Sequence, residues 1–147
     1  MYNKILIPLD GSKLAESALK HAESLAVKFN AKLILLRVVR PPSLVGREFD
    51  AMAQFQVELE LQKSEAVRYL DGLKGTFREK KIEVDVHVGF GPVVAEIIDA
   101  AESQAVDLVI IASHGRTGLG RVFFGSVASG VLNRIERPLM VIRSSGE

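Results

Sequence analysis

Stretches typical of β-strands alternate along this chain with stretches typical of helices, and this alternation restricts the fold more than any other feature. The strand-like stretches are Ile5–Leu9, Lys32–Val39, Ile82–Val88, Leu108–Ala112 and Leu139–Ile142. Between them, apolar residues recur at the helical period. The expected order, β-α-β-α-β-α-β-α-β, predicts an α/β fold: a single doubly wound (Rossmann-like) five-stranded parallel sheet with helices on both faces.

Turn and capping residues set the bounds of the expected helices. Asp10-Gly11-Ser12 is typical of a turn, and Ser12 is expected to cap a helix that Asn30 closes. Segment 41–50 has no clear period, which favours a mobile lid or loop. Gly89-Phe90-Gly91 is expected to turn the chain, and Pro92 is expected to be the first residue of the helix that follows. Two more helices are expected over about 49–80 and from Ser126 to about Glu136, and residues 144–147 as a frayed tail.

Length and composition indicate a single domain, residues 1–147, in the cytoplasm. The chain has 147 residues, with 19 Lys and Arg against 18 Asp and Glu. This balance argues against broad electrostatic binding to nucleic acid or to a membrane. There is no cysteine, which excludes a disulfide framework. The sequence has neither a signal-peptide pattern nor an apolar run long enough to span a bilayer.

A ligand is expected at one edge of the predicted sheet. In doubly wound sheets, ligands bind beyond the carboxyl ends of the strands, where the direction of winding reverses. Four strand ends meet at that edge, at Pro8–Asp10, Val38–Arg40, Val88–Gly89 and Ala112–Gly115.

The segment from Ala112 to Ser126 carries the strongest functional signal. A buried strand feeds into a glycine-rich loop, and the loop opens a helix at Ser126. This arrangement points backbone N–H groups and the positive end of a helix dipole at an anion, which predicts a phosphate-bearing ligand. The loop also supplies glycines and positive charge, at Gly115, Arg116, Gly118, Gly120, Arg121 and Gly125.

The spacing within this loop excludes three common phosphate-binding motifs. A dinucleotide fingerprint fails because Phe123 stands where G-x-G-x-x-G requires its last glycine. A P-loop fails because Gly120 and Gly125 have the glycine spacing of G-x-x-x-x-G-K-[ST], but Ser126 stands where that motif requires its lysine. A phospho-acceptor receiver domain needs clustered acids after the first strand, where only Asp10 stands.

The loop and both ends of the chain resemble the universal stress protein family. ATP-binding members of that family carry glycine, two residues, glycine, nine residues, then glycine followed by serine or threonine. Here Ala112 replaces the first glycine, and Gly115 and Gly125-Ser126 match the others. The opening Lys4–Ser12 and the ending Arg137–Ile142 are similarly typical, so the resemblance covers essentially the whole chain.

This resemblance implies a nucleotide-binding domain for ATP and a divalent metal ion, Mg²⁺ or Mn²⁺. By matched position, Pro8, Leu9 and Asp10 would line the adenine and ribose side, with Asp10 also a candidate metal ligand. Val38 would form a wall against the adenine. Ala112 and His114 would adjoin the ligand at the start of the loop. The phosphates would be held by Gly115, Arg116, Gly118, Gly125, Ser126 and Val127.

The resemblance further implies a homodimer made by pairing of the last strands, Leu139–Ile142. The expected function is an ATP-binding stress-response regulator that acts as a nucleotide-dependent dimeric switch on an unidentified protein partner. Because the P-loop lysine is missing and no water-activating base is evident, hydrolysis is expected to be weak or absent, with no catalytic residue assigned. Two alternatives stay open: a dimeric interaction protein that binds no nucleotide, and a true nucleotide hydrolase.

Overall fold

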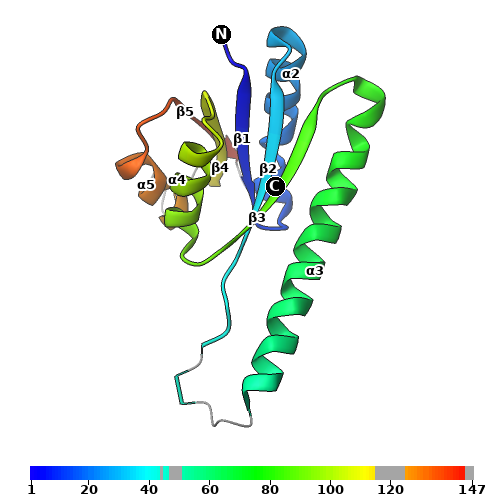
Figure 1. Cartoon of the computed structure of the whole chain (residues 1–147). Coiled ribbons are helices and arrows are strands. Elements are labelled where there is room, and N and C mark those ends of the chain that lie inside the picture. Colours follow the sequence, from blue (N-terminus) through cyan, green and yellow to red (C-terminus); the bar gives the residue numbers. More distant parts are fainter. Residues whose placement is uncertain (44, 47–50, 115–124, 145–147) are drawn as a thin grey trace.

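A computed structural model describes residues 1–43, 45–46, 51–114 and 125–144 of the chain. Its centre is a parallel sheet in the order β3-β2-β1-β4-β5 (Figure 1). The fold class predicted from the sequence is confirmed. The strands are β1 (Lys4–Leu9), β2 (Lys32–Val39), β3 (Val84–Phe90), β4 (Leu108–His114) and β5 (Leu139–Ser144).

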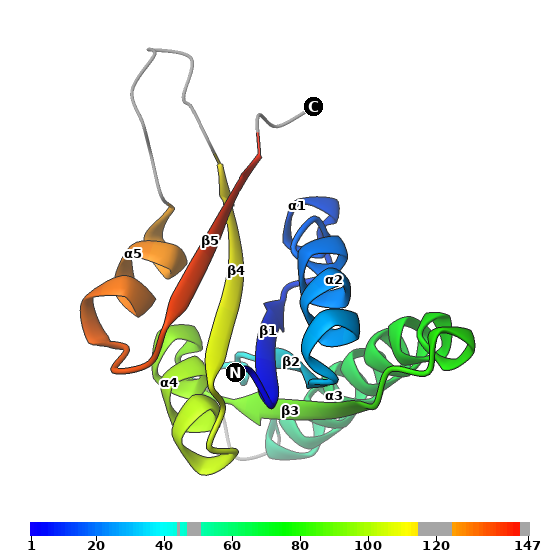
Figure 2. The same cartoon turned by 90° about the horizontal axis from the view of Figure 1, so that it is seen from above.

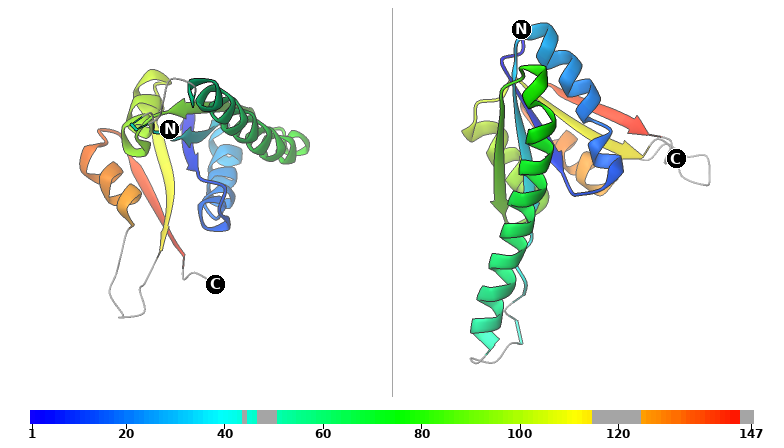
Figure 3. Two further views of the ribbon diagram at one scale, coloured as in Figure 1. Left: turned by 90° about the horizontal axis from the view of Figure 1, so that it is seen from below. Right: turned by 90° about the vertical axis from the view of Figure 1, so that its right-hand side faces the viewer.

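Helices cover both faces of the sheet, as Figure 2 shows. One face carries α1 (Lys13–Glu16), α2 (Leu19–Phe29) and α3 (Met52–Thr76), and the other carries α4 (Val93–Ser103) and α5 (Ser126–Arg134). A short 3-10 helix, η2 (Arg78–Lys80), follows α3. The long helix α3 extends past the sheet (Figure 3). Within the described ranges, no helix is long and apolar enough to cross a membrane.

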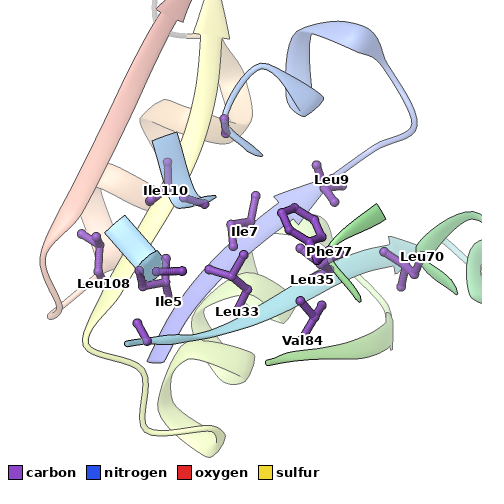
Figure 4. Packing of buried hydrophobic residues seen from close by; sticks show 14 residues of the cluster. Ile5, Ile7, Leu9, Leu33, Leu35, Leu70, Phe77, Val84, Leu108 and Ile110 are labelled. Carbon is purple, nitrogen blue, oxygen red and sulfur yellow. The ribbon is translucent and has the colours of Figure 1, made fainter. Parts of the chain in front are cut away.

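The central strands are buried on both sides, which explains their runs of consecutive apolar residues. Successive residues of a strand point to opposite faces, so alternate residues fill alternate cores. Ile5 and Ile7 pack with Leu70 and Phe77 beneath the α1–α3 layer, as Figure 4 shows. Leu6, between them in sequence, packs on the other face. Its partners there include Ile34, Leu36, Ile97, Val109 and Val131.

The first helix is broken where the sequence indicated one continuous helix. α1 ends at Glu16 and α2 begins at Leu19. The Ser17 hydroxyl donates to the carbonyl of Leu14 at 2.6 Å. The amide of Ala18 bonds the carbonyl of Ala15, three residues back, at 3.2 Å. Serine back-bonding and this tighter three-residue spacing interrupt the regular ladder.

The third strand lies later in the sequence than expected. Gly89 and Phe90, predicted to turn the chain, instead belong to β3 and pair with Val38 and Val39 of the long strand β2. Ile82 lies outside the strand. Pro92 is the N-cap of α4 rather than its first residue, with φ −62° and an extended ψ of 132°.

Smaller differences concern the ends of other elements. The expected helix over 49–80 is α3 followed by η2, and residues 49–50 lie outside the described ranges. α5 ends at Arg134 instead of near Glu136, and Ser144 belongs to β5 instead of the tail. Of segment 41–50, the described residues form neither helix nor strand.

Candidate functional site

A cleft of about 130 Å³ lies at the carboxyl edge of the sheet. β1 pairs with β2 on one side and with β4 on the other. The chain therefore winds outward from β1 in one direction through β3, then returns and continues through β4 and β5. The cleft opens at this reversal, which is where doubly wound sheets bind their ligands.

Six of the residues predicted for the site line this cleft. They come from three strands, the turn after β1 and the first turn of α5: Pro8, Leu9, Asp10, Val38, Ala112 and Val127. These residues are separated by up to 119 positions in the sequence (127 − 8), and the sheet order brings them together.

Five further lining residues were not predicted: Ala15, Leu36, Val93, Ile97 and Ile111. Leu36 could have been found, because it lies two residues before Val38 and so faces the same side of β2. Val93 and Ile97 follow Pro92 at helical spacing and belong to the stripe that packs α4 on the sheet. Their apolar side chains resemble ordinary core residues, which is why sequence reasoning assigned them no role at the site.

The turn after β1 holds Asp10 in a fixed position. Asp10 Oδ1 accepts hydrogen bonds from the Ser12 amide at 2.9 Å and from the Ser12 hydroxyl at 2.5 Å. The Ser12 hydroxyl oxygen in turn accepts from the Ala15 amide at 3.1 Å, so Ser12 caps α1 as predicted. Gly11 has φ +90°, a conformation that side chains disfavour, and this explains the glycine.

These hydrogen bonds keep the Asp10 carboxyl ionised. Partial burial alone would raise the pKa of Asp10, but the hydroxyl and amide of Ser12 donate to the charged form and the charge of Arg37 also favours it. The net effect lowers the pKa of Asp10 below its ordinary value, so the cleft has a negative charge at its mouth at neutral pH.

The N-terminus of α5 lies beside the cleft. Gly125, its N-cap, has φ 74° and ψ 155°, again a backbone conformation suited to glycine. No side chain among the described residues caps this helix, so its first amides are available to an acceptor. Ser126 is exposed, and Val127 lines the cleft. This end of the cleft therefore has the chemistry of an anion site.

The remaining predicted residues follow β4. His114 is the last residue of β4 and pairs with Ser144 of β5. The other predicted phosphate contacts, Gly115, Arg116 and Gly118, lie outside the described residues, as does the charge of Arg121. Within the described ranges there is no cluster of three or more metal-ligating side chains.

A doubly wound parallel sheet with a cleft at its reversal point defines a Rossmann-like α/β protein. A sequence model of the universal stress protein family matches residues 1–143, and this chain belongs to that family.

Individual relatives agree with this assignment. The universal stress protein MJ0531 of Methanocaldococcus jannaschii is 32% identical over 97% of this chain and 83% of its own length. The solved structure of MJ0577, from the same organism, is 31% identical, with a TM-score of 0.80 over 100% of this chain and 99% of that one. A family protein from Arabidopsis thaliana with AMP bound shares the fold at 18% identity, with a TM-score of 0.67 over 97% of this chain and 93% of that one.

Proposed function

We propose that this chain binds an adenine nucleotide between β1 and β4, as ATP with a divalent metal ion, Mg²⁺ or Mn²⁺. The observation that carries the proposal is an apolar cleft next to the uncapped N-terminus of α5. One end suits a flat base and the other an anion, and a nucleotide joins these two chemistries in one molecule. The AMP carried by the Arabidopsis protein supports an adenine ligand.

The adenine would lie against the apolar walls. Pro8 of β1 and Val38 of β2 line the cleft with aliphatic side chains, and Leu9, which is buried in the core beneath the α1–α3 layer, adjoins it. Burying a flat ring against such walls contributes about 25 cal/mol per Å² of apolar surface removed from water. Asp10, in the turn directly after β1, would face the ribose.

The phosphates would lie at the start of α5. Backbone amides and a hydroxyl there would replace the lysine that a P-loop uses. His114 and Ala112, at the end of β4, would adjoin the same region. The proposed phosphate contacts are Gly115, Arg116, Gly118, Gly125, Ser126 and Val127.

Asp10 is the proposed metal ligand. Mg²⁺ commonly binds through one or two carboxylates, completed by phosphate oxygens and water. A single ionised carboxylate at the mouth of the cleft therefore fits a metal ion that arrives with the nucleotide.

The proposed role is regulatory, in the stress response and in the cytoplasm, with the whole chain acting as one nucleotide-binding domain. No P-loop lysine is present, so the chain would be at most a slow ATPase. β5 pairs with β4 at one end of the described sheet, which leaves its outer edge for the β5 of a second copy. Such a homodimer would act as a nucleotide-dependent switch for a protein partner.

Ala112 favours a second candidate, a dimeric interaction protein that binds no nucleotide. Ala112 lines the cleft at a position where ATP-binding family members carry glycine. A methyl group at this position of the wall would leave less room for a ligand than glycine does. The two candidates differ in one measurable property, namely whether the cleft takes up a nucleotide.

Mass spectrometry of small molecules released on denaturing the purified protein tests the proposal first. Isothermal titration calorimetry with ATP, ADP, AMP and cyclic AMP, with and without Mg²⁺, then gives the preference. Gly125→Val and Ser126→Leu are expected to weaken ATP binding at least about tenfold while the fold is retained. Gly72→Val, on the exposed side of α3, is the matched control and keeps the wild-type affinity.

Two outcomes would count against the proposal. Wild-type protein that neither releases a nucleotide nor binds ATP at millimolar concentration would favour the interaction protein. Unchanged affinity in both the Gly125 and the Ser126 variants would move the nucleotide to a different site.

A further inference from the structure

Arg37 lies behind the proposed nucleotide site, on the opposite face of β2 from the cleft. Its neighbours Leu36 and Val38 line the cleft, and Arg37 alternates with them, so it faces the α1–α3 layer. In the sheet, Arg37 is the direct partner of Leu9, the last residue of β1 before the Asp10 turn. An arginine at this point of a buried strand requires an explanation, because neither apolar core uses it.

The guanidinium of Arg37 is held between α3 and the Asp10 turn. Its Cζ atom lies 5.3 Å from the ring centroid of Tyr69 on α3, within the range of a cation–π contact. On the other side, a Cβ atom built on Gly11 would come within 2.6 Å of Nη1. Arg37 therefore fills the space directly behind the backbone of Gly11.

Two further observations argue against a purely structural role. Among the residues that the structure describes, no group accepts a hydrogen bond from the buried Nη1 atom of Arg37. Buried donors of this kind are rare, and an unpaired one suggests a function other than stability. The charge of Arg37 also acts on Asp10, the carboxylate at the mouth of the cleft.

We propose that Arg37 is a positioning residue that holds the Asp10-Gly11-Ser12 turn in place for the nucleotide, and that Tyr69 orients its guanidinium. This inference rests on the proposed function, because it assigns a support to the same site. It also gives α3 a physical connection to the ligand: Tyr69 contacts Arg37, Arg37 contacts Gly11, and Gly11 adjoins the residue proposed to bind the metal ion. Occupation of the cleft would therefore change the surroundings of the Tyr69 ring on the far face of the sheet.

Calorimetry with ATP and Mg²⁺ on three arginine variants tests the positioning role. Arg37→Met removes the charge and the planar group, and is expected to weaken binding about tenfold. Arg37→Lys keeps the charge but not the planar stack, so its affinity should lie between those of Arg37→Met and wild type. Arg78→Met is the matched control, because Arg78 is exposed in η2, before β3 begins and so away from the carboxyl edge of the sheet, and it should bind like wild type.

Tyr69 supplies a test that leaves Arg37 in place. Tyr69→Phe retains the aromatic face, whereas Tyr69→Leu removes it, so the leucine variant should bind ATP more weakly than the phenylalanine variant. If Arg37→Met fails to fold, as judged by circular dichroism, this comparison and Arg37→Lys still decide the question.

A spectroscopic measurement separates positioning from simple stabilisation. The chain has two tyrosines, and Tyr2 packs edge-on against Phe29 far from the turn, with ring centroids 5.3 Å apart. In protein labelled with ¹³C on the tyrosine rings, ATP should shift the Tyr69 signal and leave Tyr2 as the reference. Arg37→Lys, which still binds, should show a reduced Tyr69 shift at saturating ATP.

Each outcome has a distinct meaning. If wild-type protein binds no adenine nucleotide, both the proposed function and this inference are wrong. If wild-type protein binds ATP, but Arg37→Met binds equally well or Tyr69 does not respond, the inference alone is overturned and the nucleotide site stands.

Discussion

Replacing Asp107 by alanine is expected to weaken the junction between β1 and β4. Asp107 Oδ2 accepts hydrogen bonds from the amides of Asn3 at 2.7 Å and Lys4 at 2.8 Å, while the Asp107 amide donates to the Lys4 carbonyl at 2.9 Å. Asp107→Ala removes the two side-chain bonds and keeps the backbone bond. Hydrogen bonds to a charged group contribute about 1.5–3 kcal/mol each, and roughly half of that total is lost to solvent screening at this partly exposed site. We therefore expect Asp107→Ala to lower the free energy of unfolding by about 2 kcal/mol.

The pH dependence of this loss follows from the pKa of Asp107. The Lys4 and Asn3 amides stabilise the charged carboxylate, so the pKa of Asp107 in the folded protein lies below its ordinary value. A lowered folded-state pKa contributes stability that is fully present above the unfolded-state pKa, about 3.9, and is lost as pH falls through the folded-state value. The difference in free energy of unfolding between wild type and Asp107→Ala should therefore be constant from pH 7 to about pH 5 and shrink below about pH 4.

Urea unfolding followed by circular dichroism measures this gap at each pH. Asp99→Ala, an exposed aspartate on α4, is the control for removal of a negative charge, and should change stability by less than about 0.5 kcal/mol. A loss below about 0.5 kcal/mol for Asp107→Ala at pH 7 would show that water replaces both side-chain bonds. If the difference in free energy of unfolding is the same at pH 3 as at pH 7, the charge of the carboxylate does not contribute to stability.

Two further substitutions test the packing of the α1–α3 layer. Leu70→Ala on α3 should lower the free energy of unfolding by about 2–5 kcal/mol because Leu70 is fully buried, whereas Leu61→Ala should lower it by less than about 1 kcal/mol because Leu61, on the same helix, is 58% exposed. Equal losses in urea titrations would mean that α3 is not packed on the sheet as described. Gly11→Ala should destabilise the protein more than Gly46→Ala, because both glycines have positive φ but only at Gly11 would the new methyl group meet Arg37. Thermal unfolding of the two variants gives the comparison, and equal decreases in Tm would refute the contact.

Local patterns were sufficient to predict the strands that are buried on both faces. Ile5–Leu9 and Leu33–Leu36 are continuous apolar runs, and only a strand covered by helices on both sides requires such a sequence. The bounds of β3 were less predictable, because they depend on a partner. Gly89 and Phe90 have the composition of a turn, and they are in the sheet because Val38 and Val39 of the neighbouring strand pair with them. The break after Glu16 likewise depends on one serine hydroxyl that can bond either water or its own helix.

The candidate site was predictable wherever a residue stands at a strand end. Pro8, Asp10 and Val38 follow this rule, since the carboxyl ends of parallel strands share one edge. Ile97 and Ile111 could not be distinguished from core residues, because the same apolar side chain serves in both places. Arg37 was missed for a different reason: its importance comes from its contacts with Gly11 and Tyr69, which lie 26 positions before it and 32 after it (37 − 11 and 69 − 37).

The cleft at the reversal point is walled by strands and helices taken from both halves of the winding. Whatever occupies it must touch the early β1–β2 unit and the late β4–α5 unit at once. Such an occupant bridges two parts of the chain that meet in the sheet where β1 pairs with β4. Its binding energy would therefore raise the resistance of the entire domain to heat and proteolysis, well beyond the few residues that it touches.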